Sequence, residues 1–134
     1  MASVLFDPGR EGILDTTVAF TTGDIRAMLV KSAYVFSAAH KFLSDITAAN
    51  DNGRSASLTA KTATNGVANA ANTTLTATAA AACASIVLFQ HTGVDTTARI
   101  ICYIDTATGL PFTPAAGGAV AVNWDTGANK IFKL

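Results

Sequence analysis

Three aspartates, each followed by a threonine, come closest to a chemical pattern in this sequence. Asp95, Asp105 and Asp125 all lie in stretches rich in glycine, threonine and alanine, which predict turns. Carboxylate oxygens from converging loops could bind calcium, but no stretch has the closely spaced acidic ligands of a calcium-binding loop. The pattern therefore favours side-chain capping of turns, and we expect no catalytic residue, cofactor site or metal site.

Asp125 also begins the sequence Asp-Thr-Gly-Ala, the short signature of dimeric aspartic proteases, in which two aspartates share one proton. Those enzymes carry the motif early and need a long following segment to build the flap and the loops that support the aspartate. Only nine residues follow Asp125 in this chain. The position favours a hairpin turn over a protease site.

The histidines and cysteines form no metal-ligand pattern. His40 and His91 have no second histidine or cysteine at ligand spacing, which favours a partly exposed helix residue and a turn residue. Cys83 and Cys102 would lie at different heights of a sheet, so we expect no disulfide between them. Both are interpreted as reduced core residues.

Composition excludes several classes of partner. Of the 134 residues, 50% are hydrophobic and 13% charged, and the formal net charge is zero, so no field attracts nucleic acid or an anionic membrane. The N-terminus lacks the features of a secretion signal, and no apolar run is long enough to span a bilayer. We expect one ordered domain, residues 1–134, without nucleic-acid or membrane partners.

The elements that must position these residues centre on a predicted hairpin in residues 85–105. Residues 85–89 and 100–104 combine β-branched and aromatic side chains over strand-like lengths, with a polar turn between them. The second strand is apolar on both faces, so we expect it to lie deepest, covered on one face by a lid helix or another subunit. Its predicted faces are Ile100, Cys102 and Ile104 on one side and Ile101 and Tyr103 on the other.

A second hairpin is predicted at Asn65-Gly66, the strongest short-range hairpin signal. A two-residue turn there pairs residues 54–64 with residues 67–78. The register puts Ala60 opposite Ala71, Leu58 opposite Thr73, and Ala56 opposite Leu75 on one apolar face. The other face carries hydroxyls, from Ser55, Ser57, Thr59, Thr74 and Thr76.

Two short helices are predicted. The first covers residues 7–14, with Asp7 as N-cap, Pro8 at the first helical position, and Ile13 and Leu14 pointing inward. The second covers residues 37–46, with Ser37 as N-cap, and would lie across the sheet as a lid.

The remaining segments predict strands and loops. Expected strands are residues 16–20, residues 25–31 with cover on both faces, and a last hairpin made by residues 119–124 and 131–134. Residues 48–54 and 106–118 are expected to be loops. Counted together, about eight short strands and two short helices predict an all-β, mainly antiparallel fold, a β-sandwich or jelly-roll-like barrel.

Two C-terminal stretches carry a family resemblance. Residues 104–114 (IDTATGLPFTP) and residues 122–134 (VNWDTGANKIFKL) closely resemble small virion proteins encoded among the head genes of tailed bacteriophages and prophages. Further similar stretches make the resemblance cover nearly the full chain: residues 7–14, 25–30, 42–46 and 60–68. This chain differs by being less acidic and richer in alanine around residues 79–84.

The resemblance implies a non-enzymatic capsid decoration (cement) protein that forms a dimer or trimer and binds the major capsid protein. It would be found on the capsid exterior of the virion, and in the host cytoplasm during assembly. The turn at residues 90–97 is then expected to be a contact loop. Two alternatives stay open: a tail, neck-adaptor or fibre-base protein of the virion, and a small binding module or hydrolase using Asp95, Asp105 or Asp125.

Overall fold

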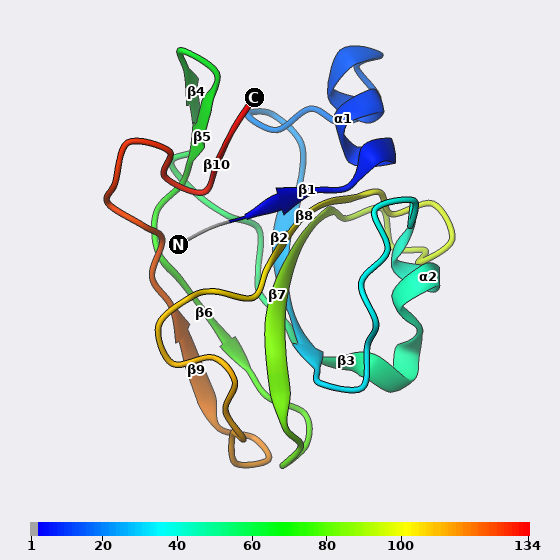
Figure 1. The fold of residues 1–134 in the computed structure, drawn as a ribbon, viewed down its shortest axis with the longest axis vertical. Helices are drawn as coiled ribbons and strands as arrows, with labels where there is room; N and C mark the ends of the chain where they lie inside the picture. Colours follow the sequence, from blue (N-terminus) through cyan, green and yellow to red (C-terminus); the bar gives the residue numbers. More distant parts are fainter. Residues whose placement is uncertain (1–2) are drawn as a thin grey trace.

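An antiparallel five-stranded sheet lies at the centre of the computed structural model, which describes residues 3–134. The central strands are long and rich in β-branched and aromatic residues, which suit a pleated sheet buried on both faces. Across the sheet the order is β1 (Val4–Leu5), β8 (Ile100–Ile104), β7 (Cys83–Gln90), β2 (Ile25–Lys31) and β3 (Asp51–Arg54) (Figure 1).

Both faces of this sheet are covered (Figure 1). On one side lie two small antiparallel sheets, and on the other lie two helices and the segment that joins β2 to the second helix. The prediction of an all-β, sandwich-like fold is therefore confirmed. The small sheets are β6 (Thr73–Thr76) with β9 (Ala119–Val122), and β10 (Phe132–Lys133) with β5 (Val67–Asn69) and β4 (Thr62–Thr64); the helices are α1 (Asp7–Leu14) and α2 (Leu43–Ile46).

The side chains of strand β2 pack in two separate cores, because they alternate between the two faces of the sheet. Ile25, Ala27 and Leu29 pack in the core under the small sheets, whereas Met28 and Val30 pack under the helical side. All five are at most 1% exposed. The prediction that this strand has cover on both faces is confirmed.

The β7–β8 hairpin is also confirmed, with a β-bulge that changes the predicted faces of β8. Leu88 pairs with Cys102 but Phe89 pairs with Ile100, so Ile101 is the extra residue. As a result Ile101 joins Cys102 on the small-sheet side, and Ile100 lies on the helical side. The strict alternation expected for residues 100–104 was therefore wrong.

The turn at Asn65-Gly66 forms as predicted, but the hairpin it closes is short. Both turn residues have positive φ, +53° and +77°, and the ladder runs from the Thr64–Val67 pair only to Thr62–Asn69. Beyond it the expected register is wrong. Leu75 forms a bridge with Ser55 rather than with Ala56, Ala71 N–H donates to the Thr59 carbonyl at 2.9 Å, and β6 forms its ladder with β9.

Three other expectations for strands and loops were also wrong. Residues 16–20 form turns, and residues 51–54 of the expected loop form β3, which pairs with β2. Residues 119–124 and 131–134 do not form a hairpin together, because β9 pairs with β6 and β10 pairs with β5. Side chains alternate along residues 119–124, with Val122 and Trp124 buried and Ala119, Ala121 and Asn123 exposed.

Both helices begin at residues other than those predicted. Helix α1 has Phe6 as its N-cap, with Pro8 at its start; Ile13 packs against the core as predicted, but Leu14 is 85% exposed. The buried Gly9 lets the helix backbone approach β8, and the buried Gly12 lies against Val18. Helix α2 begins at Leu43, where Asp45 accepts backbone N–H bonds from residues 41 and 42, so Ser37 is not its N-cap.

We predict that Gly9→Ala destabilises the fold. A methyl group at residue 9 would lie 2.7 Å from the Ile101 carbonyl oxygen and 2.9 Å from that of Ile100, both fixed in β8. The free energy of unfolding should fall by about 1–3 kcal/mol, because this overlap outweighs the roughly 1 kcal/mol that alanine adds to a helix. Urea denaturation measures the change.

The control is Glu11→Ala, on the exposed side of the same helix, which should change the free energy of unfolding by less than about 0.5 kcal/mol. A Gly9→Ala protein as stable as the wild type would show that α1 does not pack as closely on β8 as described.

Candidate functional site

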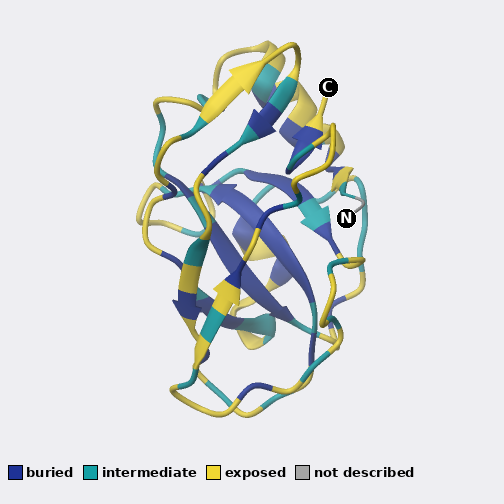
Figure 2. Cartoon of the chain, turned by 90° about the vertical axis from the view of Figure 1, so that its left-hand side faces the viewer, coloured by how far each residue is buried: buried dark blue, intermediate teal, exposed yellow. Residues whose placement is uncertain are grey.

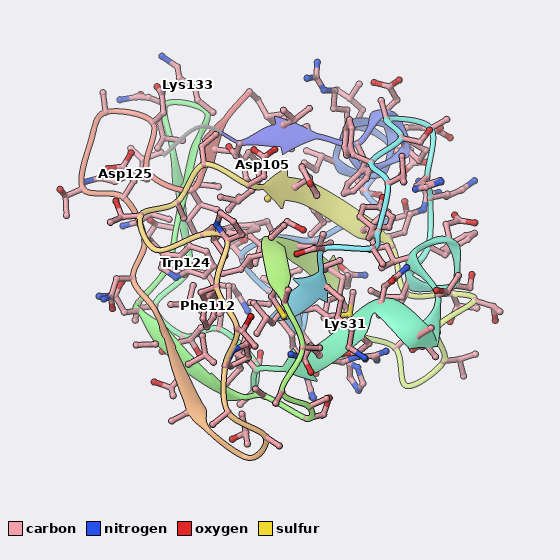
Figure 3. All side chains as sticks on the ribbon, turned by 60° about the horizontal axis from the view of Figure 1, so that its bottom comes forward. Lys31, Asp105, Phe112, Trp124, Asp125 and Lys133 are labelled. Atoms are coloured by element: carbon pink, nitrogen blue, oxygen red, sulfur yellow. The ribbon has the colours of Figure 1, made fainter. Side chains whose placement is uncertain are left out.

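The three aspartates of the Asp-Thr pairs do not meet in one site. Asp95 precedes β8 and Asp105 follows it, and this strand of five residues alone spans about 17 Å. Asp125 follows β9, in the other layer of the sandwich; Figure 3 labels it together with Asp105. Asp95 is therefore not placed to share a proton or a metal ion with Asp105.

Asp95 forms an ion pair that joins the β7–β8 turn to β3. Both of its carboxylate oxygens accept hydrogen bonds from the Arg54 guanidinium, at 3.0 and 2.9 Å, and Arg54 Nε donates to Asp51 at 2.7 Å. The guanidinium also lies over the ring of Phe89, 5.5 Å from its centroid. The hydrogen bonds from Arg54 lower the pKa of Asp95 below its usual value. The Asp95 side chain thus links the β7–β8 turn to β3 and does not cap its own turn.

Asp125 does cap a turn, as predicted. Its Oδ1 accepts the backbone N–H of Gly127 at 3.0 Å, and this bond lowers the pKa of the Asp125 carboxyl. Residues 126–130 form bends and turns, and Lys130 Nζ donates to the carbonyl of Thr126. The turn does not join two paired strands, so the expected hairpin is absent even though the turn itself is confirmed.

The histidines lie apart, and each has a structural partner. His40 is partly exposed as predicted but lies outside α2, with its Nδ1 2.7 Å from the Tyr34 hydroxyl. His91 lies in the turn that follows β7, where its ring meets that of Phe89 edge-on. Among residues 3–134, no three His, Cys, Asp or Glu side chains are close enough to hold a metal ion together.

Both cysteines are free and fully buried, as predicted. Cys83 Sγ accepts a hydrogen bond from Asn52 Nδ2, and burial raises the pKa of the Cys102 thiol to about 12. The Cys102 thiol therefore stays protonated at neutral pH, and neither thiol is exposed to solvent. In the described part of the chain, no helix is both long and apolar enough to cross a membrane.

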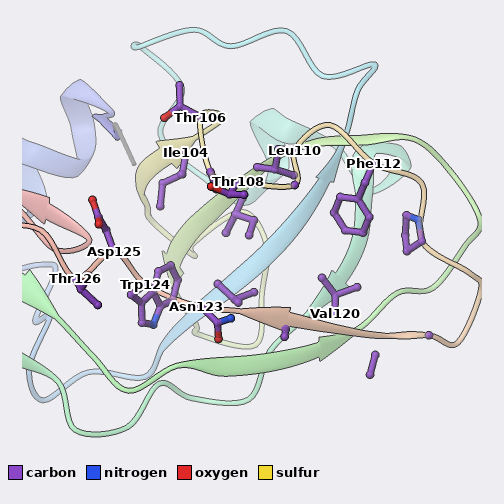
Figure 4. Close-up of a pocket in the computed structure, with 18 of the residues that line it drawn as sticks. Ile104, Thr106, Thr108, Leu110, Phe112, Val120, Asn123, Trp124, Asp125 and Thr126 are labelled. Carbon is purple, nitrogen blue, oxygen red and sulfur yellow. The ribbon is translucent and has the colours of Figure 1, made fainter.

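A groove of about 850 Å³ lies beside β9. We call it the β9 groove. Its walls are β9 with Trp124 on one side and residues 106–115 on the other, and its floor is formed by Ile86 of β7 and Ile104 of β8. Figure 4 shows Leu110 and Phe112 facing Val120 and Trp124 across it.

Both walls of the β9 groove are held in place. Trp124 donates its indole N–H to the Ala71 carbonyl at 3.0 Å, and its backbone N–H to Asn72 Oδ1 at 2.9 Å. The facing wall is fixed by Phe112, which exchanges two backbone hydrogen bonds with Cys83, 2.8 and 3.0 Å long. The groove is therefore preformed rather than dependent on closure by a ligand.

The lining of the β9 groove is mainly apolar and nearly without charge. Among the described lining residues, Asp125 carries a charge, while threonines and Asn123 supply hydroxyl and amide groups. Sequence reasoning missed this site because the lining comes from three separate stretches of chain. The signals that belong to it are the alternation of Val120, Val122 and Trp124 and the proline-bearing loop before them.

No family model, curated protein or solved structure matches the chain. The functional argument therefore depends on the residues and surfaces described above.

We predict that Asp95→Asn lowers stability in a pH-dependent way. Because the pKa of Asp95 is lowered by folding, its contribution is complete above its ordinary pKa and is lost as pH falls below about 4. The side chains of Asp95 and Arg54 are 41% and 28% exposed, so solvent screening limits the loss at pH 7 to about 1 kcal/mol or less.

Thermal unfolding of both proteins between pH 2 and pH 7 measures this effect, with Asp105→Asn as the control that leaves the Arg54 ion pair intact. The difference between wild type and Asp95→Asn should shrink at acid pH. A difference that is constant across the whole range would contradict the role given to Asp95.

We also predict that neither thiol reacts in the native protein. Because Cys83 and Cys102 are 0% exposed, a disulfide-exchange reagent at pH 8 should label no cysteine until the chain unfolds, and then both. Rapid labelling without denaturant would contradict the burial of β7 and β8.

Proposed function

We propose that the protein is a non-enzymatic structural component of a tailed-phage virion, a decoration protein that binds and stabilises the assembled capsid. The observation that carries the proposal is an uncharged, open sheet surface on the β6–β9 pair. Thr74 lies opposite Ala121 and Thr76 opposite Ala119, so these four side chains share one face, and all four are exposed. Figure 2 shows both strands in front of the buried central sheet.

Such a surface suits binding to a large, flat protein partner. Charged residues are depleted at the centres of protein interfaces. A capsid-binding protein needs area and shape rather than reactive groups, and it stabilises the shell by binding the assembled form in preference to its parts. The resemblance of residues 104–114 and 122–134 to small phage virion proteins agrees with this surface.

The proposal includes the capsid exterior as location, the host cytoplasm as the place of assembly, and the major capsid protein as partner. Self-association as a dimer or trimer is part of the same proposal, since decoration proteins gain avidity when several copies bind neighbouring capsid subunits. The second candidate is a tail, neck-adaptor or fibre-base component. Such a component could bind through the same uncharged surface, so the number of copies per particle must distinguish the two candidates.

Quantitative mass spectrometry of purified virions tests the function. Hundreds of copies per particle are expected of a protein that covers the capsid lattice. A handful of copies would support the tail or neck alternative, and absence from the particle would overturn both structural proposals.

We predict that Thr76→Lys reduces the number of copies on the particle by about tenfold or more, because an ammonium group would be buried without a partner. The matched control is Leu14→Lys, which places the same charge on α1 at a side chain that is 85% exposed. Both variants should unfold at temperatures close to that of the wild type. Equal loss of copies from both would show that the β6–β9 surface has no special role.

A further inference from the structure

The outer edge of β9 carries backbone groups that have no strand to pair with in the described chain. Strand β9 pairs only with β6, and Ala77 N–H donates to the Gly118 carbonyl at 2.9 Å, which extends the ladder. In an antiparallel pair every second residue points its N–H and C=O at the partner strand. Gly118, Val120 and Val122 therefore face β6, and the backbone groups of Ala119, Ala121 and Asn123 face away from it.

This outer edge opens into the β9 groove. Ala119, Ala121 and Asn123 all line the groove, and within residues 3–134 their backbone groups make no hydrogen bond to the facing wall. The floor of the groove, Ile86 and Ile104, belongs to the face of the central sheet that β6 and β9 otherwise cover. The groove thus lies where a third strand of the small sheet would lie.

We infer that the β9 groove accepts an extended segment of a partner protein, which pairs with β9 as the missing strand. The segment would have aliphatic side chains at every second position, facing Ile86 and Ile104. Its chemistry follows from the groove, because strand edges recognise an extended main chain and the floor is aliphatic.

A single strand fits this place better than a second copy of the whole domain. The wall formed by residues 106–115 stands opposite β9 and is fixed to β7 through Phe112 and Cys83. The edge of a folded domain would have to displace that wall to reach β9, whereas an extended segment enters alongside it. The volume of about 850 Å³ is in the range of preformed binding sites.

The inference deepens the proposed function, because on a virion the segment would be an arm or loop of the protein to which this chain is bound. Binding of peptides to the isolated chain tests the groove without assuming a virion. Binding on the particle tests the groove and the proposed function separately.

The first experiment selects displayed random nonapeptides against the full-length wild-type protein. Recovered peptides should carry aliphatic residues at alternate positions. On binding, the amides of Ala119, Ala121 and Asn123 should exchange more slowly with deuterium, while the Val120 amide, already bonded to β6, should change little. If no peptide is enriched, or if the enriched peptides leave these three amides unprotected, the inference is wrong.

Two proline variants make the selection specific. Ala121→Pro removes an outward N–H without removing a bond to β6, and one lost hydrogen bond should weaken peptide binding about tenfold. The matched control is Ala63→Pro: β4 is also an edge strand, and Ala63 points its N–H away from β5 because Thr64 and Val67 form the bonded pair next to the turn. The control should bind within about twofold of the wild type. Equal weakening by both variants would overturn the inference.

A variant that fills the groove, Val120→Phe, provides a second test if Ala121→Pro unfolds. Val120 packs at the edge of the core and lines the groove, so the larger ring should block the peptide. Unchanged binding to a folded Val120→Phe protein would contradict the inference. Sedimentation of the free protein adds one more outcome: a dimer that Ala121→Pro dissociates would make a second copy the occupant and overturn the proposal of a partner segment.

Hydrogen exchange on purified particles separates the two proposals. Both proposals are supported if the protein is present at high copy number, its residues 119–123 exchange slowly, and its residues 62–64 exchange as in the free protein. High copy number with unchanged exchange at residues 119–123 would overturn the β9 groove inference and leave the proposed function standing. Absence from particles, combined with specific peptide binding, would overturn the proposed function and leave the β9 groove inference standing.

Discussion

The structure depends on a central sheet whose middle strands are apolar on both faces. Strands β2, β7 and β8 place side chains in two cores, so water must be excluded from both sides. The small sheets cover one face, and the two helices with the segment between β2 and α2 cover the other. The polar contacts and the groove lie on opposite faces of this sheet. The Arg54–Asp95 ion pair and His40 stabilise the helical side, and the β9 groove lies on the side of the small sheets.

Incomplete cover on the small-sheet side connects the fold to the proposed function. The β6–β9 pair and the sheet of β4, β5 and β10 lie over parts of the central sheet, and a loop carrying Leu110 and Phe112 lies over another part. Between them remains an apolar groove with a free strand edge, next to an exposed face of threonine and alanine. A protein that works by burying surface against an assembly benefits from such features, since main-chain pairing gives affinity and the apolar floor gives selectivity.

Local signals in the sequence predicted local structure well. Asn65-Gly66 fixed a two-residue turn because both positions tolerate positive φ, and the density of β-branched residues identified β2, β7 and β8. Long-range pairing was not predictable. The alternation of Thr73–Thr76 fits many partner strands, and in the structure this segment forms its ladder with β9 rather than with the nearer arm of the hairpin. The bulge at Ile101 and the groove arise from contacts between distant segments, which no short motif records.

A density map of the virion, at a resolution that traces individual strands, tests the central claim most directly. We expect the map to show this chain on the outer surface of the capsid, with the β6–β9 face toward a capsid subunit and a strand of that subunit beside Ala121. A map that places the chain only at the neck or tail, or on the capsid with the β6–β9 face and the β9 groove turned to solvent, would contradict it.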